Sequence, residues 1–205
     1  MADDTVTVLF IGDSVTDCGR RDDPDRNLGH GYVRLVDEAF LAGGTPAAVV
    51  NRGVGGDRVR DLAARWEKDA LAVAPTLISV MVGVNDTWRR YDDNDPTSAE
   101  RFEADYRDIL SRLPGRDEMA LVLMEPFLLP VTPAKAKWRD DLDPKIAVVR
   151  ALAAEFGAVL VPTDEYLNGL DLPAAEITAD GVHPTELGHQ LIARLWLDTI
   201  ESAAE

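Results

Sequence analysis

The sequence contains a single cysteine, Cys18, among its 205 residues. No disulfide can form within one chain, and a lone thiol is typical of proteins in a reducing compartment. Basic residues are also scarce, because 21 Lys and Arg stand against 37 Asp and Glu, which gives a formal net charge of −16. A surface this acidic repels phosphate backbones and anionic lipid headgroups. The composition therefore argues against nucleic acids and membrane surfaces as partners.

Long hydrophobic runs are absent too. No apolar stretch approaches the roughly 20 residues that a membrane-spanning helix needs. The first residues, Met1-Ala2-Asp3-Asp4, are acidic and lack the basic region, apolar region and cleavage site of a signal peptide. We therefore expect a cytoplasmic protein. Its length and its 46% hydrophobic content fit one globular domain over residues 1–205.

Metal and nucleotide motifs are missing as well. The three histidines, His30, His183 and His189, do not show the H-E-x-x-H spacing, and one cysteine offers no Cys pair. No P-loop occurs, and Arg58 takes the place of the last glycine in a G-x-G-x-x-G reading from Gly53. The sequence therefore predicts an activity without a metal or an organic cofactor.

Short apolar runs alternate with segments of helical periodicity. Such alternation predicts an α/β fold, in which helices cover both faces of a parallel sheet. Functional side chains are then expected in the loops after the carboxyl ends of the strands. We expect strands at residues 6–11, 47–50, 77–82, 119–124 and 159–161. We expect helices at 32–43, at 59–70, after a capping box at 97–100, from an Asp143-Pro144 start to 156, and from Pro184 onward.

The first of these loops contains Gly12-Asp13-Ser14. A serine at a strand end, beside glycine and before a helical turn, is placed like a nucleophile, and the alternative role is that of a helix N-cap. The second loop runs from Asn51 to Asp57 and holds Gly53, Gly55 and Gly56. Glycines there serve either a tight turn or a backbone N–H that donates to an oxyanion.

Two further loops complete the set. Asn85 follows the third strand, where its amide either donates to a developing negative charge or closes an Asx turn. Near the C-terminus, Asp180 precedes His183 by three residues, so its carboxylate can reach back to the imidazole and fix its tautomer. Together the four loops supply a nucleophile, two oxyanion donors, a base and an orienting acid, which is the full set for acyl transfer.

These four blocks, in this order, resemble the SGNH (GDSL-type) serine hydrolase family over nearly the whole chain. The resemblance implies a three-layer α/β/α, flavodoxin-like fold with a five-stranded parallel sheet. It also implies Ser14 as nucleophile, His183 as general base and Asp180 as orienting acid. The oxyanion hole would combine the N–H groups of Ser14 and Gly56 with the side chain of Asn85. Val15 stands where the family motif has leucine.

Several stretches are similar to the acetylxylan-esterase-like branch of that family, namely 11–20, 49–57, 59–62 and 85–92. That branch removes acetyl groups from short xylo-oligosaccharides, often inside the cell, and its known members are oligomeric, so we expect a homo-oligomer acting on a small-molecule or oligosaccharide ester. One residue departs from this pattern: Ala179 precedes the acid, where an aromatic is expected in sugar-active relatives.

Three further residues, Asp13, Arg58 and Trp88, are candidates for substrate contact. The alternative role is ion pairing for the arginine and packing for the tryptophan. An apolar wall opposite the catalytic loop is expected from Phe127, Leu128, Leu129 and Trp138. Cys18 is expected to be a buried, inert thiol, and His189 a packed residue of the last helix.

Two alternatives remain open at this point. The first is a lysophospholipase, thioesterase or lipase of the same family, which would need a long apolar acyl channel. The second is a flavodoxin-like module that binds a small ligand without catalysis, with the four blocks acting only as turns. The absence of G-x-S-x-G excludes an ordinary α/β-hydrolase elbow. If Ser14 and His183 lie beyond hydrogen-bond reach, the hydrolase interpretation fails.

Overall fold

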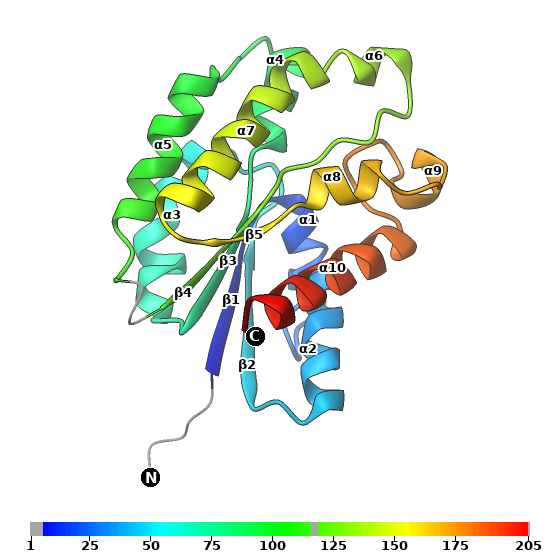
Figure 1. Ribbon diagram of the computed structural model, residues 1–205. Coiled ribbons are helices and arrows are strands. Elements are labelled where there is room, and N and C mark those ends of the chain that lie inside the picture. The colour runs from blue at the N-terminus through cyan, green and yellow to red at the C-terminus, as the bar shows by residue number, and fades with distance from the viewer. Residues whose placement is uncertain (1–5, 116–118, 205) are drawn as a thin grey trace.

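A computed structural model describes residues 6–115 and 119–204. Five strands form one sheet in the order β2-β1-β3-β4-β5, and every pair of neighbours is parallel (Figure 1). This confirms the α/β class and the five-stranded parallel sheet. The strands are β1 (Val6–Gly12), β2 (Ala47–Gly53), β3 (Leu77–Met81), β4 (Ala120–Met124) and β5 (Val159–Val161). Strand β2 runs three residues past the predicted end because Asn51, Arg52 and Gly53 pair with the end of β1.

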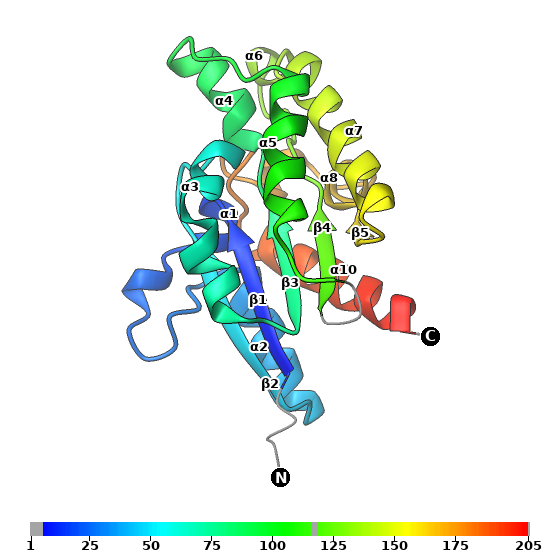
Figure 2. The ribbon, with the colours of Figure 1, turned by 90° about the vertical axis from the view of Figure 1, so that its left-hand side faces the viewer.

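Helices cover both faces of the sheet (Figures 1 and 2). One face packs against α3 (Val59–Asp69), α5 (Ala99–Ser111) and α7 (Arg139–Glu155) through a core that includes Trp66, Phe102 and Tyr106. The other face packs against α2 (Tyr32–Gly43) and α10 (Glu186–Ala204) through Tyr32 and Trp196. In all three layers the apolar side chains turn inward, so the sheet is buried on both sides, as a parallel sheet requires.

The shorter elements lie in the connections. They are α1 (Ser14–Asp17), η1 (Arg20–Asp22), η2 (Leu71–Val73), α4 (Val84–Asp92), α6 (Pro133–Ala136), α8 (Thr163–Asn168) and α9 (Ala174–Ile177). Among the helices of the described segments, none combines the length and the apolar character that crossing a membrane requires.

Three predicted helix starts were wrong. Ser98, and not Thr97, caps α5, because its side chain accepts the Arg101 N–H; Thr97 is buried and hydrogen-bonds Asp86. Helix α10 begins at Glu186, two residues after Pro184, which forms an isolated bridge with Thr178 instead.

Helix α7 also begins earlier than predicted. This helix begins at Arg139 and contains Pro144, which was predicted to open it. Proline lacks the N–H for one intrahelical bond. The additional turn is nevertheless stabilised by burial, because Leu142 and Ile146 pack with Trp138 in a third apolar cluster. Tertiary packing therefore outweighs the local start signal.

Candidate active site

Ser14, His183 and Asp180 form a continuous hydrogen-bonded relay at the carboxyl end of the sheet. Ser14 is the first residue of α1, and its Oγ lies 3.0 Å from His183 Nε2. His183 Nδ1 lies 2.9 Å from Asp180 Oδ2. The structure thus brings together all three predicted side chains. Their contacts satisfy the distance criterion set above for a hydrolase, since both fall within ordinary hydrogen-bond range.

The carboxylate of Asp180 is held ionised. Its partial burial opposes the charge, but its oxygens accept hydrogen bonds from the His183 backbone N–H, the His183 ring and the Val182 N–H. These bonds keep the pKa of Asp180 below its usual value. A fixed carboxylate in this position selects the His183 tautomer with the proton on Nδ1, which leaves Nε2 free to accept a proton from Ser14.

The loop that carries Ser14 is placed by a close approach of two strands. A Cβ on Gly12 would lie 2.1 Å from the carbonyl oxygen of Met81 on β3, so only glycine fits there. Asp13 follows and caps α1, because its Oδ1 accepts the Val15 N–H at 3.1 Å. The cap explains why this segment turns at once into a helix. Ser14 therefore lies just beyond the carboxyl end of β1, with its side chain facing His183.

The predicted oxyanion donors lie across from the serine. Gly56 has a φ of +87°, a conformation that side chains rarely adopt, which sets the direction of its loop. Asn85 is 5% exposed, and its Nδ2 donates one hydrogen to the Asp57 carbonyl oxygen at 3.1 Å. An amide NH₂ carries two hydrogens, so the second one remains for another acceptor. Ser14, Gly56 and Asn85 all line the same cavity.

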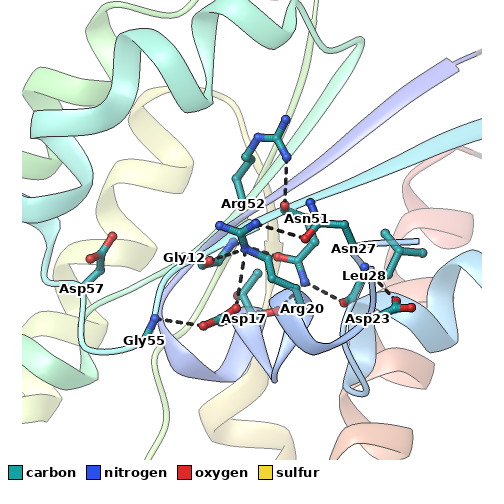
Figure 3. Close-up of polar contacts among 12 residues, drawn as sticks. Gly12, Asp17, Arg20, Asp23, Asn27, Leu28, Asn51, Arg52, Gly55 and Asp57 are labelled. Atoms are coloured by element: carbon teal, nitrogen blue, oxygen red, sulfur yellow. Dashed lines mark hydrogen bonds and ion pairs between the residues drawn. The ribbon is translucent and has the colours of Figure 1, made fainter. Parts of the chain in front are cut away.

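The glycine loop is anchored to the end of α1 (Figure 3). Gly55 donates its N–H to Asp17 Oδ2 at 3.3 Å, and Arg20 donates from Nε to the Gly53 carbonyl at 2.7 Å. A tight turn was one of the two roles expected for Gly53. Gly53 is instead the last residue of β2, and a Cβ there would lie 2.1 Å from the backbone nitrogen of Asp17. Glycine therefore permits α1 to pack directly on β2.

A buried asparagine adds to this anchor. Asn51 is 1% exposed, and its Nδ2 donates to the carbonyl oxygens of Thr16 and Leu28 at 2.7 and 2.8 Å. Its Oδ1 accepts the Gly53 N–H at 2.8 Å. Both polar atoms of the Asn51 amide are thereby hydrogen-bonded to the loops around the site (Figure 3).

Arg65 also supports the site, although nothing in the sequence marks it beyond its place on a predicted helix. From α3 it donates one hydrogen bond from Nε to Asp57 at 2.6 Å and another from Nη2 to the Gly12 carbonyl at 3.0 Å. It also donates Nη1 to the Arg52 carbonyl at 2.8 Å. One guanidinium thus ties the loop of the nucleophile to the loop of Gly56, using the fixed fork of donors that arginine carries.

Three carboxyl groups lie beneath the site. Burial, helped by the nearby charges of Asp57 and Asp86 and opposed by the Val15 N–H hydrogen bond, raises the pKa of Asp13 to about 7. Burial likewise raises the pKa of Asp86 to about 7, although Asp86 accepts the Val59 N–H. The pKa of Asp57 is also raised by burial, against the opposing effect of Arg65. Burial is therefore the first cause of the raised pKa in all three carboxyl groups.

A cavity of about 430 Å³ opens above the relay. It is lined by Ser14, Gly55, Gly56, Asn85, Trp88, Arg89, Asp92 and His183. Among these residues no aliphatic side chain occurs. Apart from the imidazole of His183, the one aromatic ring is that of Trp88, whose centroid lies 5.7 Å from the His183 ring.

The structure places the other candidate substrate residues away from this cavity. Asp13 is 2% exposed and points into the fold as the cap of α1. Arg58 pairs with Asp95 at 2.7 Å and is not among the residues that line the cavity. The expected apolar wall is not one surface. Phe127 and Leu129 belong to the core on the α2 and α10 face of the sheet, whereas Leu128 and Trp138 pack in the cluster next to Trp88.

The remaining histidines and the cysteine lie elsewhere. His189 is buried on α10, where its Nε2 lies 3.3 Å from Cys18 Sγ and its Nδ1 accepts the Tyr32 N–H. Burial lowers the pKa of His189 to about 4 and raises the pKa of the partly buried Cys18 thiol. Within residues 6–115 and 119–204, no three His, Cys, Asp or Glu side chains gather as metal ligands.

Comparison with known proteins finds the family that the sequence motifs resemble, and the match covers most of the chain. A family model described as "GDSL-like Lipase/Acylhydrolase family" matches residues 10–191. An acetylxylan esterase of Geobacillus stearothermophilus is 35% identical over 94% of this chain and 93% of its own length. A crystal structure of an acetylxylan esterase from that organism has a TM-score of 0.87 at 33% identity, covering 98% of this chain and 96% of that chain.

A more distant solved structure is an α/β hydrolase enzyme from the metagenome of Lake Arreo. It has a TM-score of 0.83 at 28% identity and covers 95% of this chain and 94% of its own. Structures of the Geobacillus enzyme include catalytic mutants in which a serine, an aspartate or a histidine is replaced by alanine. That aspartate and histidine stand three positions apart, and a tryptophan directly precedes the aspartate. Asp180 and His183 share the spacing, whereas Ala179 replaces the tryptophan.

Proposed function

Because the chain belongs to the GDSL-like lipase/acylhydrolase family, we propose that it is a serine esterase that removes short acyl groups, chiefly acetyl, from carbohydrates such as xylo-oligosaccharides. The observation that carries this proposal is the relay from Ser14 Oγ through His183 to Asp180, at the floor of a cavity without aliphatic lining. The similarity to an acetylxylan esterase supports the acetyl group and the sugar.

The reaction begins when Ser14 Oγ attacks the ester carbonyl and His183 Nε2 takes the serine proton. The carbonyl oxygen becomes an oxyanion, which accepts hydrogen bonds from the N–H groups of Ser14 and Gly56 and from the free hydrogen of Asn85 Nδ2. Asp180 stabilises the imidazolium that His183 becomes. The C–O bond to the alcohol then breaks, and His183 returns the proton to the alcohol oxygen.

Deacylation repeats these steps with water. His183 takes a proton from the water, whose oxygen attacks the acetyl-serine carbonyl, and the same donors stabilise the second oxyanion. Cleavage of the ester to Ser14 returns the proton to Ser14 Oγ and releases acetate. Neither half of the reaction draws on a group from outside the chain other than water.

The cavity favours a short acyl group over a long one. A lipase or lysophospholipase buries its acyl chain against aliphatic side chains, at a gain of about 0.8 kcal/mol per methylene. The lining residues offer that chain only Trp88, together with the polar side chains of Arg89 and Asp92. Such a lining suits the hydroxyl groups and the ring face of a sugar. The net charge of −16 also opposes anionic lipid substrates.

Initial rates on p-nitrophenyl esters from acetyl to octanoyl test this proposal. We expect a steep preference for acetyl that disappears in Ser14→Ala, with a loss of about 10⁴-fold or more in kcat. Ser202→Ala, an exposed serine near the end of α10, is the matched control and retains full activity. A preference for octanoyl would favour the lipase alternative. Activity that survives in Ser14→Ala, or is absent from the wild type, would overturn the serine mechanism.

A further inference from the structure

Lys135 is a partly buried residue whose ammonium nitrogen is covered by other atoms of the protein. It lies on α6, within the connection from β4 to α7, and its Nζ is buried without a hydrogen-bond partner in the part of the chain that the structure describes. Instead the ammonium lies 3.8 Å from the ring centroid of Trp88 and 3.6 Å from that of Trp138. Both distances fall well within the range of a cation–π interaction. Two aromatic faces therefore take the place of the missing acceptors.

The two tryptophans belong to a larger aromatic cluster that joins α4 to the α6–α7 junction. Trp88 and Trp138 meet edge to face with centroids 5.2 Å apart, and Tyr91 stacks on Trp138 at 5.0 Å. Tyr91 also donates its hydroxyl to the Lys137 carbonyl at 2.9 Å. We call Lys135, Trp88, Trp138 and Tyr91 the aromatic clamp. Figures 1 and 2 both show α6 beside α4 at the end of the molecule where the strands' carboxyl ends lie.

The clamp reaches the relay through one ring. Trp88 presents its indole to Lys135, yet it also lines the cavity and lies 5.7 Å from the His183 ring, measured between centroids. Lys135 itself does not line the cavity. Its charge is attracted by Asp180 and by Asp92, which oppose the lowering of its pKa by burial. Lys135 thus lies behind Trp88. Among the described residues, its only ring contact with the cavity lining is to Trp88, while its charge is also attracted by Asp180 and Asp92.

The position of Trp88 relates it to one half of the substrate. In the proposed reaction the carbonyl oxygen lies toward Gly56 and Asn85, because they hold the oxyanion. The alcohol oxygen must lie within hydrogen-bond reach of His183 Nε2, which returns the proton to it. Trp88 is the aromatic side chain of the cavity beside His183, so its ring adjoins the alcohol. It is therefore suited to stack on a sugar ring.

We propose that Lys135 is a positioning residue that holds Trp88 beside His183 and thereby sets the preference of the enzyme for ring-shaped alcohols. This inference rests on the proposed function, since it assumes that Ser14 and His183 perform the acyl transfer. It extends that function because recognition of the alcohol half of the ester would then depend on a residue outside the cavity.

The test compares two esters that share the acetyl group and differ in the alcohol, namely ethyl acetate and an acetylated methyl xyloside. Both give the same acetyl-enzyme, so kcat/KM reports only binding and acylation. In Lys135→Met, which keeps the length and removes the charge, we expect kcat/KM for the xyloside to fall about tenfold, as the loss of a desolvated cation–π contact predicts. For ethyl acetate we expect a change of less than about twofold, since no ring meets Trp88.

Two variants separate the charge from the fold. Lys135→Arg should restore the preference for the xyloside to within about threefold of the wild type, because a guanidinium also stacks on aromatic faces. Lys137→Met removes an exposed lysine from the same segment and should leave both rates unchanged. If Lys135→Met lowers the Tm by more than about 5 °C, Lys135→Gln replaces it in the comparison.

Equal losses for both esters, or an Arg variant no better than Met, would overturn the inference and leave Lys135 a purely structural role. An unchanged ratio in Lys135→Met would do the same while the esterase proposal stands, provided that Ser14→Ala is inactive on both esters. By contrast, a wild type without Ser14-dependent activity on either ester would overturn the proposed function and the inference together. The two failures are therefore distinguishable in one set of assays.

Discussion

Asn85 and Asp57 are joined by a hydrogen bond from the side-chain Nδ2 of the first to the backbone carbonyl of the second, at 3.1 Å. Asp57 directly follows Gly56, so this bond fixes the Asn85 amide against the loop that carries the other proposed oxyanion donor. The two donors come from the ends of different strands, β2 and β3, yet one bond sets their relative position. The geometry of the proposed oxyanion hole is therefore built before any substrate binds, which is what electrostatic preorganisation requires.

Replacing Asn85 by alanine should lower kcat by about 10²–10³-fold, because one oxyanion donor is lost. The free energy of unfolding should fall by no more than about 2 kcal/mol, since only one hydrogen bond to the Asp57 carbonyl disappears. Asn85→Asp should lose at least as much activity, because a carboxylate donates no hydrogen bond and opposes the oxyanion. Steady-state rates on p-nitrophenyl acetate check both variants. A kcat within tenfold of the wild type would exclude Asn85 from the oxyanion hole.

Arg65→Met should destabilise the protein and slow the reaction together. The substitution leaves Asp57 without its 2.6 Å partner and frees the Gly12 carbonyl. Breaking a pair this buried is expected to lower the free energy of unfolding by about 3 kcal/mol, measured by urea denaturation. Arg194→Met is the control, because its pair with Asp198 is exposed and worth less than about 1 kcal/mol. Equal effects of the two variants would show that Arg65 does not support the site.

The pKa of Asp13, about 7 in the folded protein, predicts a pH dependence of stability. In the unfolded chain this carboxyl has a pKa of about 3.9. Between these two values the folded state binds a proton that the unfolded state lacks, so the contribution of Asp13 to stability is lost as the pH rises from about 4 to about 7. Above that range the contribution no longer changes.

Asp13→Asn tests this dependence, because the amide oxygen can still accept the Val15 N–H while the titration disappears. The variant should gain stability relative to the wild type as the pH rises from 4.5 to 7.5, by more than about 1 kcal/mol in all. Urea unfolding at five pH values across this range gives the difference directly. Two curves that run parallel would show that Asp13 does not titrate in this window.

The sequence predicted those parts of the site that belong to short local motifs. Ser14, Asn85 and the Asp180–His183 pair each lie at the end of a strand or segment, and their chemistry depends on residue type at a fixed local spacing. The alternation of apolar runs likewise predicted the sheet, since a strand buried on both faces leaves a continuous hydrophobic signal. Both kinds of pattern are local, so one chain is enough to find them.

The supporting residues could not be found in this way. Arg65 contacts Gly12, 53 positions away, and Lys135 meets Trp88 across 47 positions; in each case the partner is set by the fold, not by a local pattern. Asp13 and Arg58 are candidates for substrate contact from the sequence, yet the fold turns the first inward and pairs the second with Asp95. Burial also moved the start of α7 ahead of Pro144.

Gly53 lies where β2 meets α1, the helix that carries Ser14. In Gly53→Ala the new Cβ would lie 2.1 Å from the backbone nitrogen of Asp17 and 2.6 Å from its Cα. Backbone atoms cannot rotate away, so α1 must shift as a whole. We expect a loss of about 3 kcal/mol or more in the free energy of unfolding, together with a lower kcat, because Ser14 moves relative to His183.

Gly55→Ala is the matched control for stability. Its Cβ would meet nothing closer than 3.8 Å, and its φ lies outside the left-handed region, so the fold should tolerate the methyl group with a change of less than about 1 kcal/mol. Urea denaturation of the two variants side by side measures the difference. If both lose the same stability, glycine at 53 does not serve the close approach of α1 to β2, and the position of Ser14 depends on the Asp17, Arg20 and Asn51 hydrogen bonds instead.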